Sequence, residues 1–208
     1  MESTSTPHRQ FRPWELGRLE NLTEGIFAIA MTILVLNLET PVLKSPFSST
    51  ALLQALASNW HDLLNYAISF YILGSLWVGH NQQLHLLRYT NRRHLWLNLL
   101  WLMFICLVPF TASVRGNYPN LISANILIHI NLICTGLLNF AQVTVAGSDP
   151  ELLESEARKA ELKKFQKGTM ILPLSGLAGI ALSFLAPSWS MMGYLIIPPV
   201  MVRKLHLR

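Results

Sequence analysis

Long apolar stretches alternate with short polar ones along most of the 208 residues. The first stretch runs from Leu22 to Leu38 and contains one acidic residue, Glu24. Pro41 follows closely and favours a helix end, because proline has no backbone N–H with which to continue a helix. Five later stretches have the same character: Leu63–Leu87, Leu95–Val114, Leu121–Ala146, Met170–Ala186 and Met191–Val202. Since about 20 apolar residues span the hydrocarbon of a bilayer as a helix, the pattern predicts six membrane-spanning helices.

Composition agrees with this prediction. Apolar residues make up 51% of the chain and charged residues only 13%, with a mean hydropathy of +0.37, whereas a soluble domain carries about 25% charged residues. We therefore expect an all-α polytopic membrane protein that forms one domain over residues 1–208. The sixth stretch is the shortest, and Pro198-Pro199 would kink it.

The distribution of Lys and Arg predicts the orientation. Fourteen of the sixteen lie on one side of the predicted membrane: Arg9, Arg12, Arg18, Arg88, Arg92, Arg93, Arg158, Lys159, Lys163, Lys164, Lys167, Arg203, Lys204 and Arg208. Only Lys44 and Arg115 fall in the loops on the other side. Because cytoplasmic loops are enriched in Lys and Arg, both termini are expected in the cytoplasm, with residues 1–21 as a cytoplasmic N-terminus.

Two polar connections have helical character of their own. Residues 149–167 place Pro150 near a helix start and acidic residues before basic ones, which matches the helix dipole. We expect a solvated cytoplasmic helix there, which leads into the fifth stretch. In the loop 41–62 on the opposite side, residues 51–60 suit a short interfacial helix with Trp60 at the headgroups.

The first stretch carries a regular apolar stripe. Ile29, Ile33 and Leu36 are spaced i, i+4 and i+7, which places them on one helix face, and Thr32 lies at the edge of that face. From spacing alone the stripe could face lipid, pack against another helix or line a pore.

A few ionisable residues lie near the cytoplasmic ends of the first two stretches. Arg18 and Glu24 are costly at the membrane boundary, so they either find partners or extend to the headgroups. His80 is predicted at the same level and could hydrogen-bond to them. No metal site is expected, because only His85 accompanies His80 and no Cys or carboxylate completes a ligand set.

Several functional classes lack a sequence signature. The chain has no nucleotide-binding loop, nucleophile–base pair or zinc signature. The orientation in the membrane already accounts for its Lys and Arg residues, so they do not indicate nucleic-acid binding. For an intramembrane enzyme the best pair would be His129 with Ser123, which is a poor one. We therefore expect neither an enzyme nor a bound cofactor.

The start of the first stretch is similar to a known marker. Arg18, Leu22, Thr23 and Glu24 occupy the positions of an Arg-x-x-x-Phe-Ser-Asp motif, with hydroxyl and carboxylate kept. The run from Gly25 to Leu36 continues the likeness, as do Trp77, His80, Asn98 and Pro109-Phe110. On these residues the chain resembles the transmembrane protein 175 family of potassium-permeable channels.

This resemblance implies a weakly selective potassium channel, a homotetramer in the cell membrane whose first helices line a central pore. Ile29 would form the narrowest hydrophobic ring, and Thr32, Ile33 and Leu36 would follow toward the outside. An intracellular network would tie the first helix to the second, and its members would be Arg18, Thr23, Glu24, Trp77 and His80. The expected ligands are permeant monovalent cations and the lipid bilayer.

Two other membrane functions remain open at this point. A small secondary transporter would show broken helices and charge at mid-membrane, for which Asn37 and His129 are weak candidates. A structural membrane subunit would carry the same hydropathy pattern and transport nothing.

Overall fold

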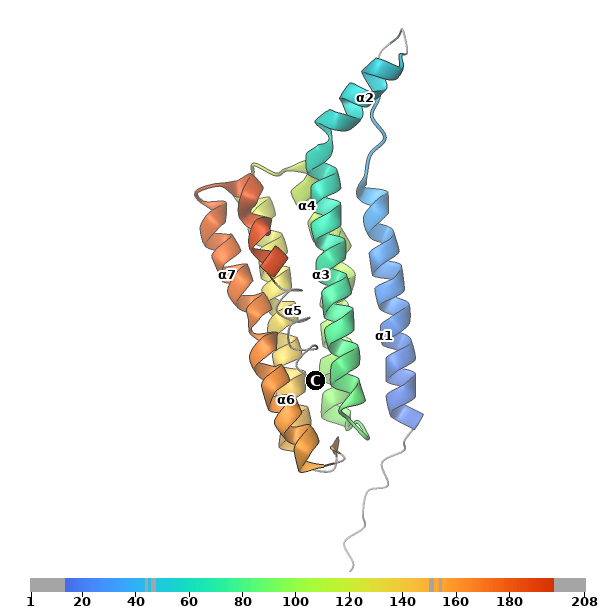
Figure 1. Cartoon of the computed structure of the whole chain (residues 1–208), viewed down its shortest axis with the longest axis vertical. Helices are drawn as coiled ribbons and strands as arrows, with labels where there is room; N and C mark the ends of the chain where they lie inside the picture. Colours follow the sequence, from blue (N-terminus) through green and yellow to red (C-terminus); the bar gives the residue numbers. More distant parts are fainter. Residues whose placement is uncertain (1–13, 44, 46–47, 150–151, 154, 197–208) are drawn as a thin grey trace, which may run out of the picture.

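The computed structural model describes residues 14–43, 45, 48–149, 152–153 and 155–196. These form an elongated bundle whose longest helices run along one axis (Figure 1). The helices are α1 (Trp14–Ile33), α2 (Ser49–Ser58), α3 (Trp60–His85), α4 (Arg92–Asn117), α5 (Ile122–Ser148), α6 (Glu156–Thr169) and α7 (Ile171–Ser183), with 3₁₀ helices η1 (Leu34–Asn37) and η3 (Pro187–Ile196). Within the described residues, strand pairing is confined to an isolated bridge between Leu87 and Leu153. The all-helical prediction is therefore confirmed.

The first helix begins earlier than its apolar stretch. It starts at Trp14 instead of near Leu22 and continues through η1 to Asn37. The added turns contain good helix formers, and Leu19 within them is buried among Leu84, Leu87 and Val143. Hydropathy missed these turns because their charged residues lower the average, although one face is still packed.

Helices α3, α4 and α5 correspond to the predicted second, third and fourth stretches, except that α3 ends two residues before Leu87 and α5 begins one residue after Leu121. Pro109 lies inside α4 without ending it. The sequence places polar residues regularly along α3, which buries Asn65, Ser69 and Gln83. Helix α3 is long enough to cross a membrane. Its polar residues lower its hydropathy, so it is not among the most apolar helices.

By length and apolar composition, three helical segments of the described chain could cross a membrane: Leu16–Asn37, Arg92–Asn117 and Ile122–Ser148. Helix α7 has only 13 residues, shorter than the predicted Met170–Ala186. The sixth stretch, Met191–Val202, is described only to Ile196, as part of η3, and its remainder lies outside the described residues.

The polar connection before α7 is helical from Glu156, several residues later than the expected start at 149. Ser155 caps this helix by accepting a hydrogen bond from the Arg158 backbone N–H. Pro150, which the sequence placed in the first turn, lies outside the described residues. The short helix expected over residues 51–60 is found as α2, Ser49–Ser58, which Ser48 caps in the same way, and Trp60 begins α3 instead.

Helices α5 and α7 approach closely because glycines face large side chains. A methyl group on Gly179 would lie 2.4 Å from the His129 ring, and one on Gly176 would lie 2.4 Å from Ile133. The His129 ring is itself fixed, since its Nδ1 lies 2.8 Å from the Tyr194 hydroxyl oxygen in η3. This contact joins α5, α7 and η3 into one packed unit.

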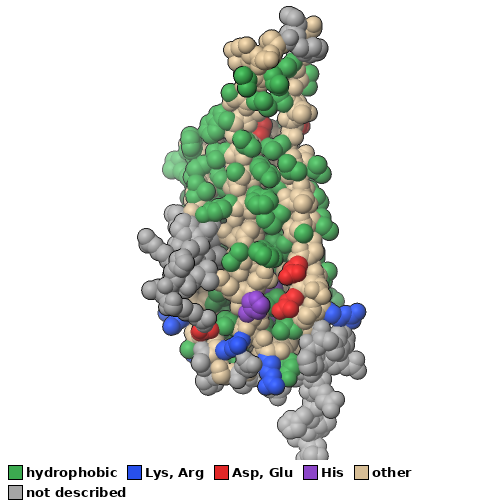
Figure 2. Space-filling view, turned by 45° about the vertical axis from the view of Figure 1, so that its right-hand side comes forward, with side chains coloured by type: hydrophobic (Ala, Val, Ile, Leu, Met, Phe, Trp, Pro, Cys, Tyr) green, Lys and Arg blue, Asp and Glu red, His purple; other side chains and the backbone are tan. Residues whose placement is uncertain are grey.

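Side-chain chemistry divides the molecule along its axis. Hydrophobic side chains cover much of the middle, and Lys and Arg gather near the end that carries α6 (Figure 2). We call this the α6 end and the opposite one the α2 end. In Figure 1, α1 and α7 lie at opposite edges of the bundle, with α3, α4 and α5 between them.

Candidate functional site

One face of α1 packs into the bundle. Phe27, Ala30 and Leu34 are almost fully buried and belong to the main hydrophobic core with residues of α3, α4 and α5. Their i, i+3 and i+7 spacing is that of one helix face. The remaining circumference of α1 is available for other contacts.

Near the α6 end, a buried hydrogen-bond cluster joins α1 to α3 and α4. Asn98 of α4 lies between the other two members: its Oδ1 is 2.5 Å from His80 Nε2, and its Nδ2 donates to Thr23 Oγ1 at 3.4 Å. All three side chains are fully buried. Because Asn98 Oδ1 can only accept, the hydrogen bond assigns the ring proton of His80 to Nε2.

Aromatic rings fill the space beside this cluster. The Trp101 ring centroid lies 4.4 Å from that of His80 and 5.5 Å from that of Phe27. Trp101 is fully buried, and through these two ring contacts it packs against both α3 and α1. Such ring pairs add about 0.5–1.5 kcal/mol beyond the area that they bury.

We expect Asn98→Leu to destabilise the protein markedly. The change leaves the Thr23 hydroxyl and His80 Nε2 buried without the amide that joins them, and each buried unsatisfied group costs about 1–3 kcal/mol. The thermal midpoint of the purified protein in detergent should fall by several degrees. Asn117→Leu, at the exposed end of the same helix, should leave it nearly unchanged, and equal midpoints for the two variants would contradict the role of Asn98.

Toward the α2 end, a second contact joins the first helix to α4. The Asn37 side-chain amide donates to the Pro109 carbonyl oxygen at 3.0 Å. Asn37 ends η1, where the chain leaves its helical path for the extended residue Leu38. The first helix is thus hydrogen-bonded to α4 at the middle of α1, through Thr23, and at the end of η1, through Asn37.

The predicted apolar stripe lies on the outer surface of the single chain. Ile29 is 60% exposed and Leu36 is 77% exposed, and Ile33 and Thr32 are exposed with them. The Thr32 hydroxyl donates to the Ile29 carbonyl oxygen at 2.9 Å. Since this bond uses the hydroxyl proton, the lone pairs of Thr32 Oγ1 remain available on the exposed face.

The structure brings together some of the predicted polar site residues and leaves others apart. Thr23 and His80 meet through Asn98, as described above. Arg18 and Glu24 are exposed, and Trp77 is partly exposed on α3. In the single chain these three residues therefore lie outside the buried cluster. Sequence reasoning noted Asn98 only through the resemblance and did not place it at the centre.

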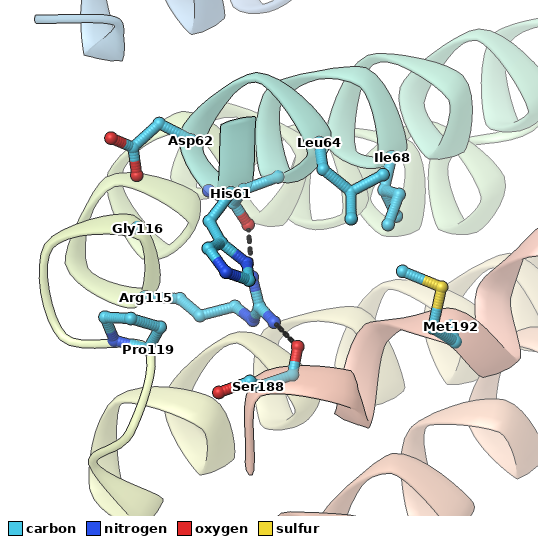
Figure 3. A pocket seen from close by; sticks show the side chains of 10 residues that line it. His61, Asp62, Leu64, Ile68, Arg115, Gly116, Pro119, Ser188 and Met192 are labelled. Carbon is cyan, nitrogen blue, oxygen red and sulfur yellow. Dashed lines mark hydrogen bonds between the residues drawn. The ribbon is translucent and has the colours of Figure 1, made fainter. Parts of the chain in front are cut away.

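A buried arginine links four elements at the α2 end (Figure 3). Arg115 is only 6% exposed, although its charge had suggested an external loop. Its guanidinium donates to Asn65 Oδ1 at 2.9 Å, to Asn125 Oδ1 at 3.1 Å and to the Ser188 carbonyl oxygen at 2.8 Å. These bonds cross-link α3, α4, α5 and η3. The sequence did hold a signal for this cluster: Asn65, Arg115 and Asn125 are polar residues near those ends of the second, third and fourth apolar stretches that lie on the same side of the predicted membrane.

Neither a metal centre nor a catalytic pair is found among the described residues. They contain no group of three or more His, Cys, Asp or Glu side chains placed to hold a metal ion. His129 is buried against Tyr194, whereas Ser123 is exposed, so the pair considered for an intramembrane enzyme does not form. Within this part of the chain, the distinctive arrangement is the exposed stripe on a firmly held first helix.

Comparison with known proteins places the chain in a family. The model of the family described as endosomal/lysosomal potassium channel TMEM175 matches residues 18–109. A potassium channel of Chamaesiphon minutus is 30% identical over 176 residues, which cover 83% of this chain and 86% of that protein. A potassium channel of Streptomyces collinus is 35% identical over 104 residues, and this match spans about half of each protein (50% and 49%).

The fold is also similar to a solved structure. The crystal structure of a lysosomal potassium-selective channel TMEM175 homologue from Chamaesiphon minutus superposes with a TM-score of 0.77. The superposition covers 91% of this chain and 97% of the other, at 24% sequence identity. At that identity the likeness establishes the shared fold.

Proposed function

Since the chain belongs to the TMEM175 family of ion channels, and not to an enzyme family, we propose that it forms a potassium-permeable, weakly selective cation channel. Its pore is lined by the first helix of each of four identical subunits. Three of its helical segments are long and apolar enough to cross a membrane. The names of the bacterial relatives support potassium as the permeant ion, and the exposed face of α1 supports this helix as the pore lining.

The observation that carries the proposal is the exposed apolar stripe of α1. A helix at the edge of a bundle that buries one face and exposes Ile29, Ile33 and Leu36 on another presents this second face either to lipid or to neighbouring subunits, and the proposal assigns it to the subunits. Four such helices around an axis would cover it with one another and leave a narrow path between them. One chain cannot enclose such a path alone, so the proposal requires an oligomer.

Within that path, Ile29 forms the constriction. A ring of four isoleucine side chains expels water when narrow, so a cation must lose part of its hydration shell to pass. Potassium is larger than sodium and loses its hydration water more easily. The constriction therefore gives potassium a modest preference over sodium. One turn farther along, the outward lone pairs of Thr32 Oγ1 replace some of the lost water.

The hydrogen bonds at Thr23 and Asn37 set the position of the first helix. Thr23–Asn98–His80 and Asn37–Pro109 both connect it to α4, so rotation of this helix between closed and open states must change one or both contacts. We propose that Arg18, Glu24 and Trp77 complete the intracellular network in the tetramer, where their exposed side chains can meet neighbouring subunits.

The proposed topology keeps six crossings with both termini and α6 in the cytoplasm. Lys and Arg gather near the α6 end and the apolar belt lies beyond them (Figure 2), which fits this orientation in a bacterial plasma membrane. Residues 1–21 and the α6 region would then lie on the cytoplasmic side, within a single channel domain.

Potassium flux through the purified chain in liposomes tests the proposed function. Vesicles that contain the protein should release potassium down its gradient, with slower sodium movement and no saturation by a co-transported substrate. Saturable flux coupled to a second solute would support a transporter instead. Vesicles as tight as protein-free ones would leave only a structural role.

A further inference from the structure

Helices α6 and α7 follow one another with almost no break. The single residue between them, Met170, has helical φ and ψ of −74° and −12°. The Met170 carbonyl oxygen accepts the first hydrogen bond of α7, from the Leu174 backbone N–H at 3.1 Å, and the Met170 backbone N–H donates to the Gly168 carbonyl oxygen at the end of α6. Helix faces can therefore be followed from α6 into α7 with the ordinary helical period.

The inward face of this continuous segment is fixed on α5. Leu162 of α6 is buried, and the Gln166 side-chain amide donates to Thr144 Oγ1 of α5 at 2.7 Å. In α7, Gly176 and Gly179 lie against α5. These contacts determine which face of the segment points away from the protein.

The outward face changes from cationic to apolar at the junction. Leu174 and Leu177 are 58% and 56% exposed, on the edge of the bundle opposite α1 (Figure 1). Lys163 and Lys167 are exposed about three and two turns before Leu174, so they lie on the same helix face. The face therefore presents lysine ammonium groups directly beside an apolar strip.

Helix geometry places the two lysines at the depth of lipid headgroups. With a rise of about 1.5 Å per residue, Lys167 lies about 4.5 Å and Lys163 about 10 Å along the axis from Met170, where the apolar run begins. The headgroup layer of one leaflet is about 5–8 Å thick, and flexible lysine side chains adjust within it.

We propose that Lys163 and Lys167 form a docking surface for anionic phospholipids, whose phosphates contact the ammonium groups while their acyl chains lie along Leu174 and Leu177. The positive charge selects anionic over zwitterionic headgroups, since the latter carry a compensating cation. The inference rests on the proposed function in one respect: α1 faces the pore axis, so the opposite edge faces lipid.

Native mass spectrometry of the full chain in detergent tests this surface. The protein is titrated with phosphatidylglycerol or with phosphatidylcholine of the same acyl chains, and bound lipids are counted. The wild type should retain phosphatidylglycerol preferentially. Lys163→Gln with Lys167→Gln should weaken that binding about fivefold for each lysine, or about 25-fold together. Equal retention of the two lipids, or unchanged retention by the double variant, would overturn the proposal.

Two controls separate a specific surface from net charge or misfolding. Lys163→Arg with Lys167→Arg keeps the charge and should keep the lipid preference. Arg88→Gln removes an exposed charge from the α3–α4 connection, where the guanidinium already lies 5.1 Å from the Tyr89 ring centroid, and should change retention little. An effect of Arg88→Gln as large as that of the lysine pair would reduce the proposal to bulk electrostatics and overturn it.

The readout is independent of ion flux. A chain that conducts potassium but shows no lipid preference overturns only the docking surface. A chain that binds phosphatidylglycerol through these lysines but conducts no ions overturns the proposed function and leaves the surface intact.

Discussion

Channels that carry Ile29→Asn should pass larger currents than the wild type and lose most of their preference for potassium over sodium. Asparagine is smaller than isoleucine and its amide holds water, so the proposed constriction would be wider and stay wet, and the dehydration barrier would fall. Each reduction of about 1.4 kcal/mol in that barrier raises flux about tenfold. Single-channel recordings in planar bilayers measure both quantities.

Two further variants give this experiment its controls. Ile130→Asn makes the same change at an exposed position on α5, away from α1, and should leave conductance and selectivity as they are. Thr32→Val removes the oxygen lone pairs near the constriction at nearly constant side-chain volume and should lower potassium conductance without widening the pore. If Ile29→Asn behaves like Ile130→Asn, Ile29 does not line the conduction path.

The sequence was most informative where one physical effect dominates. Continuous apolar stretches predicted helices at α3, α4 and α5, because in a membrane nothing else satisfies the backbone. The stripe of Ile29, Ile33 and Leu36 was visible from helical period alone. That period could not say what the stripe faces, since lipid, a neighbouring helix and a pore select similar side chains.

Long-range polar contacts were beyond the reach of sequence patterns. His80 shares one predicted depth with Arg18 and Glu24 and could have bonded to them, but depth does not give the rotation of a helix about its axis. The structure turns His80 toward Asn98 of α4 instead. Arg115 was assigned to a loop for a related reason: its charge was visible, and its three hydrogen-bond acceptors lie on other elements.

Gly136→Ala should be among the most destabilising single-methyl additions in the described chain. A methyl group at this position of α5 would lie 2.4 Å and 2.6 Å from Cδ and Cγ of Pro173, and 3.1 Å from its backbone nitrogen. A proline ring cannot rotate away, so α7 itself must shift. Overpacking of this kind costs about 1–3 kcal/mol and sometimes more. Thermal unfolding in detergent should show a clearly lower midpoint.

A double-mutant cycle separates this clash from a general effect of alanine on α5. Pro173→Ala removes the opposing ring, so Gly136→Ala should cost much less in that background than in the wild type, with a coupling of about 1 kcal/mol or more. Gly193→Ala, where nothing lies within 4 Å of the added methyl group, should change the midpoint little. Additive effects of Gly136→Ala and Pro173→Ala would mean that the two helices are not in contact there. Because His129 and Tyr194 lie in the same α5–α7–η3 unit, loss of this contact would loosen the side of the bundle that faces away from α1.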